Sequence, residues 1–368
     1  MNILYVVTVG GTMCFFNEFI GELIRDGHTV DIACNDSISP VSSFYSEAGC
    51  KIHTIEMFRS PLNKSNLAAI KQLRQLVEKN KYDIVHCHTP VAAMCTRLAC
   101  RKARKNGTKV FYTAHGFHFY KGAPLKNWML YYPVEKICSH FTDVLITINQ
   151  EDYVLAQKKM KAKRVEYVPG VGIDLTKFGQ AAVDKSAKRK ELGIPEEATL
   201  LLSVGELNEN KNHETVIRAI ADMPNVHYVI AGKGSLQEHL QGVIDELNLA
   251  TRVKLLGFRK DIEELCAAAD VYAMPSFREG LSVALMEAMA SGLPCVVSKI
   301  RGNTDLIDEM GGALFDPHSA EDCQSAIKML LDLDFAQMGE YNREKIKRFS
   351  LDVVNEQMMD IVQQSMLV

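Results

Sequence analysis

The sequence lacks the cysteine pattern of a disulfide-stapled or zinc-binding protein. Its ten cysteines form no C-x-x-C pair and mostly fall inside apolar stretches, so we expect reduced thiols in a cytosolic core. No apolar run reaches the roughly 20 residues that a membrane-spanning helix needs, because Glu287 and Pro294 interrupt the longest one. The N-terminus reads MNILYVV, without a basic start or a cleavage site. It predicts a strand rather than a signal peptide, and we expect a cytoplasmic protein.

Neither positive nor negative charge dominates the sequence as a whole, since the net charge is −3 at pH 7. The balance hides an asymmetry, because residues 1–172 carry 22 Lys and Arg against 14 Asp and Glu, whereas residues 173–368 carry 20 against 31. A basic half suits an anionic membrane surface or an acidic acceptor. That half shows no helix-turn-helix, zinc-finger or aromatic RNP pattern, so no nucleic-acid partner is expected.

Short Val- and Ile-rich runs alternate with helical patterns through both halves of the 368 residues. This alternation is typical of α/β proteins with doubly wound parallel sheets, and the length suits two domains. We predict domains over 1–172 and 173–349, a linker at 169–185, a helix over 65–80 capped by Ser65, and a last amphipathic helix at about 350–368. The predicted strands are Ile3–Val9, Thr29–Cys34, Ile84–His86, Lys109–Thr113, Val144–Thr147 and Val165–Val168, then Thr199–Val204, Val226–Ala231, Val253–Leu255, Val271–Met274 and Cys295–Ser298.

The most informative segment follows the fourth strand of the second domain. Gly280 gives the backbone freedom before a helix whose first amide groups, near Leu281, Ser282 and Val283, would bind a phosphate. Glu279 precedes this helix and can accept hydrogen bonds from sugar hydroxyls. Glu287 lies about 9 Å further along the helix, which is too far for that phosphate but suitable for a ribose diol.

This segment resembles a known family. The spacing of Glu279 and Glu287 in EGLSVALMEAMASGLPCV, followed by Gly302 and residues 305–307, resembles the family 4 retaining glycosyltransferases of the GT-B fold, most closely those of bacterial capsule and exopolysaccharide synthesis. The resemblance spans nearly the whole chain. It implies two Rossmann-like domains facing across a cleft, a C-terminal helix that returns to the first domain, a UDP-sugar donor and no bound metal or other cofactor. It also implies that Glu279 meets the donor sugar and Glu287 the ribose.

A second candidate group, Lys211, follows the strand at 199–204 by seven residues. Its ammonium can reach a diphosphate there and neutralise the leaving group. In the family this loop commonly reads G-R-L-x-x-x-K, with both cations on the diphosphate, but here Glu206 stands in place of the Arg. Either Lys211 carries the charge largely alone, or Arg278, Arg259 or a group of the first domain assists.

Two glycine-rich turns are open to two interpretations. Gly232-x-Gly234 predicts either tight strand-to-helix packing or nucleotide contact, because the third glycine and the acid of a dinucleotide fingerprint are missing. Gly10 and Gly11 follow the first strand, as either a plain tight turn or, by the resemblance, the family's glycine loop near the donor phosphates.

Three further residues gain a role from the resemblance. Phe258 and Arg259 match the family's base-binding edge, although an aromatic residue there is more often part of a core. His115 matches the family's active-site histidine, where its ring or backbone can orient the sugar; the alternative is a structural loop histidine.

The run His86-Cys87-His88 looks like a metal-binding cluster. On a strand, however, residues i and i+2 share a face and Cys87 turns away from it, so we expect no metal there.

Together these patterns predict a retaining enzyme that moves a hexosyl or N-acetylhexosaminyl group from a UDP-sugar to a saccharide acceptor, with His115, Lys211 and Glu279 as catalytic residues. The alternatives are a UDP-N-acetylhexosamine epimerase and a catalytically silent nucleotide-sugar binding protein.

The expected acceptor is lipid-linked, which would place the enzyme peripherally at the inner face of the plasma membrane. Anionic lipid would meet Arg101, Lys102, Arg104 and Lys105. An aromatic segment around Lys121 and Lys126 forms either a membrane edge or a loop and core helix, and comprises Phe117, Phe119, Tyr120, Trp128, Tyr131 and Tyr132.

Overall fold

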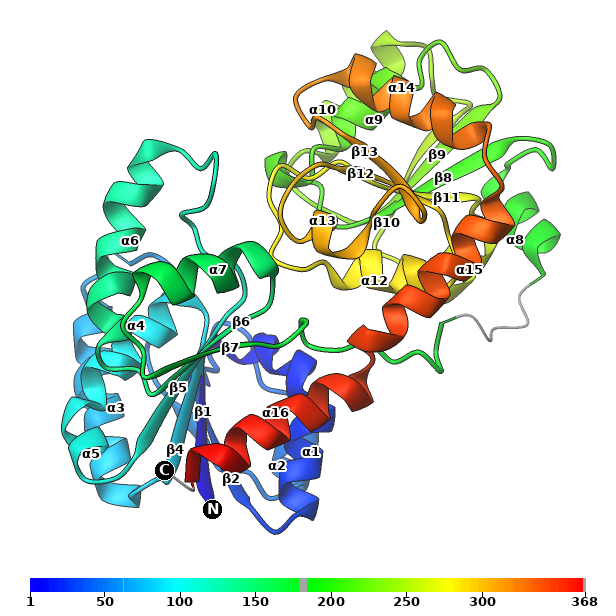
Figure 1. The fold of residues 1–368 in the computed structure, drawn as a ribbon. Helices are drawn as coiled ribbons and strands as arrows, with labels where there is room; N and C mark the ends of the chain where they lie inside the picture. The colour runs from blue at the N-terminus through cyan, green and yellow to red at the C-terminus, as the bar shows by residue number, and fades with distance from the viewer. Residues whose placement is uncertain (62, 179–183, 367–368) are drawn as a thin grey trace. The chain divides into compact units, whose positions relative to one another are not determined.

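A computed structural model describes residues 1–61, 63–178 and 184–366. The chain divides into a first unit, Met1–Val171 with Val354–Val368, and a second unit, Gly172–Val353. Each unit contains one parallel sheet with helices on both faces (Figure 1), which confirms the predicted fold class. Residues 179–183 of the predicted linker and the last two residues of the predicted C-terminal helix lie outside the described residues.

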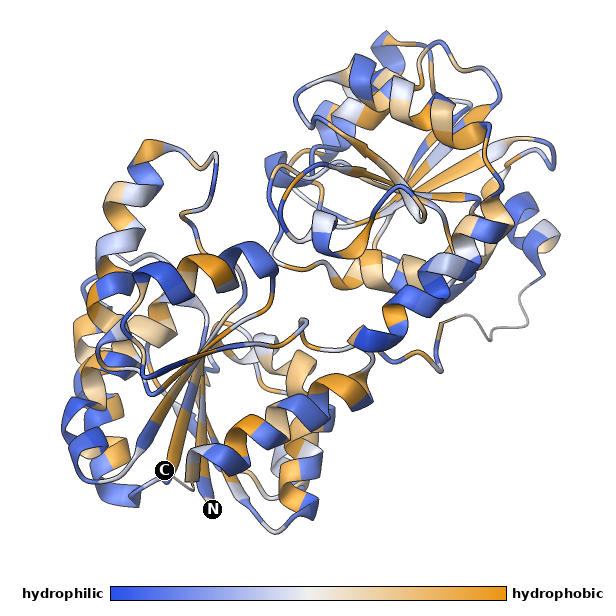
Figure 2. Ribbon diagram, viewed as in Figure 1, coloured by the Kyte–Doolittle hydropathy of each residue, from blue (hydrophilic) through white to orange (hydrophobic). Residues whose placement is uncertain are grey.

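The first unit has a seven-stranded sheet in the order β3-β2-β1-β4-β5-β6-β7. Its strands alternate between two cores: Leu4 and Val6 of β1 face one, whereas Tyr5 and Val7 face the other. Because both faces of β1 are buried, this strand is largely apolar, and apolar residues dominate the middle of the sheet (Figure 2). The strands are β1 Asn2–Val9, β2 Thr29–Asn35, β3 Ile52–Thr54, β4 Ile84–His88, β5 Lys109–Ala114, β6 Val144–Thr147 and β7 Arg164–Tyr167. The helices are η1 Gly10–Phe16, α1 Asn17–Arg25, α2 Ser43–Glu47, α3 Ser65–Asn80, α4 Pro90–Ala99, α5 Arg101–Lys105, α6 Leu125–Ser139, α7 Gln150–Lys159 and α16 Leu351–Met366.

The last helix of the chain, α16, completes the first unit, as the fold class predicted. Its apolar side chains Val354, Met358 and Ile361 belong to the same core as Tyr5 and Val7. The side chain of Asn355 also donates a hydrogen bond to Glu22 of α1 at 2.9 Å.

A buried ion pair joins α4 to α6. The guanidinium of Arg97 donates two parallel hydrogen bonds to the Glu135 carboxylate, at 2.9 and 3.0 Å. The two side chains are only 1% and 10% exposed, and the guanidinium lies 4.3 Å from the centre of the Tyr112 ring. The pair therefore fixes one face of α6 against the rest of the first unit.

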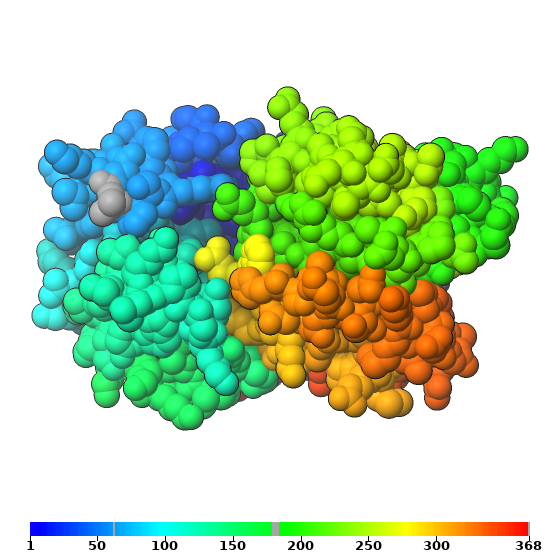
Figure 3. Space-filling view, turned by 90° about the horizontal axis from the view of Figure 1, so that it is seen from above, coloured from blue at the N-terminus to red at the C-terminus, as the bar shows by residue number. Residues whose placement is uncertain are grey.

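The opposite face of α6 is apolar and exposed. Its exposed fractions are 74% for Leu125, 69% for Met129, 63% for Leu130 and 58% for Ile137, and Figure 3 shows this segment in teal at the surface. The predicted aromatic segment is different, because Phe117, Phe119 and their neighbours Trp128, Tyr131 and Tyr132 pack in or against a core. Burial excludes Phe117 and Phe119 from a membrane edge, and for the other aromatic residues of the segment that interpretation stays a prediction.

The second unit has a six-stranded sheet in the order β10-β9-β8-β11-β12-β13. Its strands are β8 Thr199–Val204, β9 Val226–Ala231, β10 Val253–Gly257, β11 Val271–Met274, β12 Cys295–Ser298 and β13 Gly312–Phe315. Its helices are α8 Lys185–Leu192, η2 Glu209–Lys211, α9 His213–Ala219, α10 Gln237–Glu246, α11 Ile262–Ala268, α12 Val283–Ala290, α13 Asn303–Leu306, α14 Ala320–Leu331, α15 Phe335–Ile346 and η3 Lys347–Phe349.

The strand order reverses direction once in each sheet. The change falls between β1 and β4 in the first unit and between β8 and β11 in the second. Open parallel sheets bind ligands where loops part beyond the carboxyl ends of the strands at such a point. The loops that follow these four strands are therefore where candidate site residues belong.

Two local predictions need correction. Helix α3 has the predicted bounds, but Ser65 is its first residue and not its cap, and the Asn63 side chain accepts a hydrogen bond from the Ser65 amide at 2.9 Å. The short strands β3 and β13 were not predicted.

Candidate functional site

The loop after β8 presents Lys211 at the end of η2. Asn208 begins this turn, and its side-chain oxygen accepts a hydrogen bond from the Lys211 amide at 3.0 Å. Asn212 follows with a left-handed φ of 52°, which asparagine tolerates better than most residues. Its side-chain amide donates to the carbonyl groups of Pro275 at 3.0 Å and Pro317 at 2.9 Å. The loop is thereby fixed against the loops that follow β11 and β13.

The loop after β11 is joined to the same turn and presents Glu279. The Phe277 amide donates to the carbonyl of Asn210 at 2.8 Å, and the Asn210 side chain donates to the carbonyl of Arg278 at 2.9 Å. These bonds place the Lys211 ammonium 2.8 Å from a carboxylate oxygen of Glu279. The two side chains are 21% and 14% exposed. Two of the three predicted catalytic residues, 68 positions apart in the chain, thus form one ion pair.

Arg259 and Arg278 are the two predicted substitutes for the missing family cation. The guanidinium of Arg259 is bound by Asp261 at 2.5 Å and by Glu191 at 2.9 Å, and these hydrogen bonds raise the pKa of Arg259. Arg278 has no carboxylate within 4.0 Å among the residues that the structure describes, and it directly precedes Glu279. Arg278 is therefore the better candidate for the additional positive charge.

Helix α12 begins later than the sequence predicts. Ser282 is its N-cap, and the serine hydroxyl accepts a hydrogen bond from the Leu285 amide at 3.4 Å. The helical amides without a partner inside the helix are consequently those of Val283 and Ala284. Gly280 and Leu281 precede the helix, so of the predicted cluster at residues 281–283 only the Val283 amide belongs to the helix.

Glu287 lies in the second turn of α12 and is half-buried. Burial raises the pKa of its carboxyl to about 7; the Lys177 ammonium lowers that pKa and the Glu263 carboxylate raises it. A carboxyl group with such a pKa changes its charge near neutral pH, and this change has a testable effect on ligand binding.

The glycines after β9 are needed for close packing of the backbone. A Cβ atom on Gly232 would lie 1.8 Å from the carbonyl oxygen of Gly205, and one on Gly234 would lie 2.2 Å from that of Leu207. The turn after β9 thus rests directly on the loop that carries Lys211. This favours the packing interpretation of Gly232 and Gly234, and nucleotide contact stays a prediction.

Phe258 lies after β10 with 67% of its surface exposed. The expectation of core packing at this position is therefore wrong. Its ring is accessible, and a role at a base-binding edge stays a prediction.

In the first unit, Gly10 and Gly11 begin η1 at the carboxyl end of β1. A Cβ on Gly10 would lie 2.5 Å from the Ser39 carbonyl oxygen, and one on Gly11 would lie 2.4 Å from the Ser39 hydroxyl. Both glycines let the segment after β2 approach this turn, and contact with a phosphate stays a prediction.

His115 directly follows β5 and is half-buried. Its Nε2 lies 3.1 Å from Nδ1 of His88 at the end of β4, while Nε2 of His86 lies 2.8 Å from the Thr113 hydroxyl. Burial lowers the pKa of His115 to about 4 and that of His86 to about 3, so both rings are neutral at physiological pH. Sequence reasoning considered His88 only as part of a metal cluster; its position beside His115 was missed.

Cys87 faces the opposite core from its two histidine neighbours, as predicted, and its thiol donates to the Phe111 carbonyl at 3.1 Å. Within the described residues, no three His, Cys, Asp or Glu side chains are grouped so that they could hold a metal ion.

Family models match both parts of the chain. Residues 2–149 match the model described as glycosyl transferase 4-like, and residues 184–347 match glycosyl transferases group 1. EpsD of Bacillus subtilis strain 168, provisionally named a glycosyltransferase, is 39% identical over 317 residues, covering 84% of this chain and 83% of EpsD. The UDP-Gal:alpha-D-GlcNAc-diphosphoundecaprenol alpha-1,3-galactosyltransferase of Escherichia coli is 29% identical over 319 residues, covering 82% of this chain and 80% of that enzyme.

The fold is also similar to solved structures. HepE of Anabaena, crystallised with UDP, superposes with a TM-score of 0.81 over 99% of this chain and 100% of that one, at 21% identity. At that identity the likeness shows the GT-B fold alone. Together with the family models and the similarity to EpsD, it establishes that the chain belongs to the group 1 glycosyltransferases of family 4 type and is a glycosyltransferase of exopolysaccharide type with the GT-B fold.

Proposed function

We propose that the enzyme transfers a hexosyl or N-acetylhexosaminyl group from a UDP-sugar to a lipid-linked saccharide, with retention at the anomeric carbon. The observation that carries this proposal is the Lys211–Glu279 ion pair at the carboxyl ends of β8 and β11, next to the start of α12. At this place a cation and the helix amides can bind a diphosphate, and a carboxylate can accept hydrogen bonds from sugar hydroxyls. The names of the relatives agree, since the Escherichia coli enzyme is named for UDP-Gal and a diphosphoundecaprenol-linked acceptor.

The proposed chemistry follows the charge that develops as the glycosidic bond breaks. The transition state gains oxocarbenium character while electrons move onto the diphosphate. The Lys211 ammonium and the amides of Val283 and Ala284 stabilise that charge, and Glu279 accepts hydrogen bonds from the sugar. His115 orients the sugar. The departing phosphate deprotonates the acceptor hydroxyl, which then attacks from the same face.

The decisive experiment supplies the purified enzyme with UDP-glucose, UDP-galactose and their N-acetyl forms, with and without an extract of bacterial lipid-linked saccharides. We expect one donor to be consumed only when the acceptor is present, and the product to keep the donor's anomeric configuration by NMR. Conversion of the UDP-sugar without an acceptor would instead indicate an epimerase. Binding of UDP-sugar with no turnover on any acceptor fraction would indicate a silent binding protein.

The pKa of Glu287 predicts how donor binding depends on pH. The proposed ribose contact needs the carboxylate, which with a pKa of about 7 is mostly protonated at pH 6 and mostly ionised at pH 8. We therefore expect the dissociation constant of UDP to be up to about tenfold higher at pH 6 than at pH 8. Calorimetry over this range measures it. The Glu287→Gln variant should bind weakly at both pH values, and an unchanged pH profile in that variant would contradict the assignment.

We further propose that the first unit docks on an anionic membrane surface through the exposed face of α6 and a neighbouring basic pocket. No helix of the described chain is both long and apolar enough to cross a bilayer. A helix face that exposes Leu130 and Ile137 instead suits partial insertion at the interface. The α6 helix ends at the pocket, because His140 and Phe141, which follow it, line the pocket wall.

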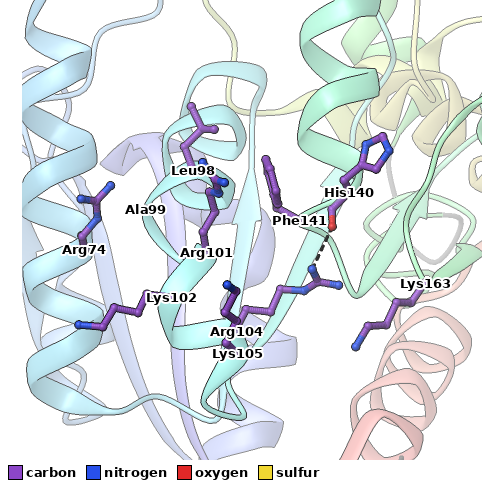
Figure 4. Close-up of a pocket in the computed structure, with 10 residues that line it drawn as sticks. All are labelled: Arg74, Leu98, Ala99, Arg101, Lys102, Arg104, Lys105, His140, Phe141 and Lys163. Atoms are coloured by element: carbon purple, nitrogen blue, oxygen red, sulfur yellow. Dashed lines mark hydrogen bonds between the residues drawn. The ribbon is translucent and has the colours of Figure 1, made fainter.

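The basic pocket has a volume of about 660 Å³ and is shown in Figure 4. Not all of its charge is available: Arg104 and Lys163 are bound by Asp143 at 2.8 and 2.9 Å. Arg101 stacks on the Phe141 ring at 4.5 Å, and neither Arg101 nor Lys105 has a carboxylate within 4.0 Å among the described residues. The lining residues are Arg74, Leu98, Ala99, Arg101, Lys102, Arg104, Lys105, His140, Phe141 and Lys163.

Neutralising two of these cations tests the membrane proposal. A lysine or arginine near an anionic surface contributes about 1 kcal/mol, so the double substitution Arg101→Gln with Lys105→Gln should weaken binding to phosphatidylglycerol vesicles about 30-fold. A matched control, Lys51→Gln with Lys328→Gln, removes the same charge elsewhere and should bind as the wild type does. Vesicle flotation measures both. Equal flotation of the wild type with anionic and zwitterionic vesicles would refute the proposal.

A further inference from the structure

The histidine beside His115 occupies a position that its own packing does not explain. His88 is 2% exposed, and its ring lies between Phe16 and the other histidines, with centroids 4.4 Å from Phe16, 4.2 Å from His86 and 5.3 Å from His115. Burying an imidazole among apolar rings costs free energy unless its nitrogens are hydrogen-bonded. Only one of them is: Nδ1 meets His115, while Nε2 is buried without a partner in the described structure.

The backbone at this point is also strained. Thr89, the next residue, has a φ of 63°, which is rare for a β-branched side chain. Pro90 begins α4 and disfavours a helical conformation at Thr89. The Thr89 hydroxyl is held at 2.7 Å from that of Thr8 at the end of β1. Strain of this kind persists where the surrounding structure imposes it, and it clusters at functional sites. Here it lies where the strand order reverses, between β1 and β4.

The pattern of hydrogen bonds decides which nitrogens carry protons. Burial lowers the pKa of His88 well below its ordinary value, so both rings are neutral and only one of the two facing nitrogens carries a proton. If the proton were on Nε2 of His115, His88 would carry its own on Nε2, where a buried N–H would have no acceptor. An unpaired buried acceptor is tolerated more often than an unpaired N–H. The favoured arrangement therefore has Nδ1–H of His88 donating to Nε2 of His115.

We propose that His88 is a positioning residue that holds His115 as its Nδ1–H tautomer and so presents a hydrogen-bond donor to a hydroxyl oxygen of the transferred sugar. This inference rests on the proposed function of His115. No described residue bonds Nδ1 of His115, so that nitrogen is available to a ligand. The arrangement moves no proton and forms no covalent bond; it fixes the orientation of the ring before the glycosidic bond breaks.

Two substitutions at one position separate the hydrogen bond from the volume of the side chain. His88→Leu fills the space without a donor, whereas His88→Asn places an amide N–H close to where Nδ1 was. We expect His88→Leu to lower kcat about tenfold with the KM for the donor changed less than about twofold, the pattern of an interaction that strengthens in the transition state. His88→Asn should recover kcat to within about threefold of the wild type.

A spectroscopic measurement gives a readout that a purely structural role would not move. In protein labelled with ¹⁵N-histidine, long-range proton–nitrogen correlations report which ring nitrogen of His115 is protonated. The wild type and His88→Asn should show Nδ1–H, and His88→Leu a mixture of tautomers. The control is His227→Asn in β9, which removes another buried histidine with an unpartnered nitrogen and should leave both kcat and the His115 signal unchanged.

The inference is overturned if wild-type His115 is protonated on Nε2, a result that requires no variant to fold. It is equally overturned if His88→Leu leaves the His115 signal and kcat as they are. Absence of transfer by the wild type from every UDP-sugar would refute the proposed function and leave the tautomer measurement intact. The two failures are therefore distinguishable.

Discussion

Replacing Lys211 with alanine is expected to lower kcat for sugar transfer by about 10²- to 10³-fold, the usual loss when one preorganised group that stabilises transition-state charge is removed. The effect is large because Lys211 is only 21% exposed, so water compensates poorly for the lost ammonium. Steady-state kinetics with the donor that the enzyme uses measures it. The matched control is Lys328→Ala, an exposed lysine on α14 of the same unit, for which wild-type turnover is expected.

The Glu279→Ala variant should lose most activity as well. Because the two side chains form one ion pair, the double variant should be less impaired than the product of the two single losses predicts. Each single substitution leaves the partner's charge half-buried without its counter-ion. This part of the loss occurs in both single variants but not in the double variant. Near wild-type turnover in either single variant would exclude the role given to that residue. Strictly multiplicative losses would show that the pair does not act together.

Removing the carboxylate of Glu135 is expected to destabilise the first unit by about 3–5 kcal/mol, because the Arg97 guanidinium then stays buried without a counter-charge. Its other contacts, the Ala93 carbonyl at 2.9 Å and the Tyr112 ring, do not neutralise it. The single tryptophan, Trp128, lies on α6, so its fluorescence reports unfolding of this unit. Urea titration of Glu135→Ala measures the change in unfolding free energy.

Two comparisons make this prediction specific. Glu78→Ala removes an exposed carboxylate 3.6 Å from Lys102 and should cost less than about 1 kcal/mol. The double substitution Arg97→Met with Glu135→Leu removes both charges and should recover most of the stability, since apolar side chains of similar size replace buried ion pairs well. A loss below about 1 kcal/mol in Glu135→Ala would show that solvent reaches the pair.

The fold could be predicted largely from the sequence because its central strands are buried on both faces. Runs such as residues 3–9 and 199–204 are mostly apolar on both faces, which indicates buried parallel strands without a polar–apolar alternation. The strands β3 and β13 escaped prediction because their short sequences, IHT and GALF, are not the Val- and Ile-rich runs that mark a buried parallel strand. A periodic pattern can also predict burial wrongly. Leu67 fits the apolar helical spacing of α3, yet its side chain is 72% exposed.

The candidate site could be predicted in part. Lys211 and Glu279 were recognisable because each follows a strand, but their contact depends on β8 lying beside β11, and chain order does not determine that adjacency. The pairing of His88 with His115 was missed for the same reason, since it depends on β4 lying beside β5. The strand pattern correctly placed Cys87 on the other face. It could not show that one of the two remaining histidines ends beside His115.

The path of α16 has a consequence for how this protein is made. The core of the first unit needs Val354, Met358 and Ile361, which leave the ribosome after every residue of the second unit has been synthesised. The second unit is contiguous in sequence, from Gly172 to Val353, and can complete its own core earlier. The first unit, most of which is translated first, therefore completes its core last. Premature termination before residue 354 would leave this unit with an uncovered apolar surface and dependent on chaperones.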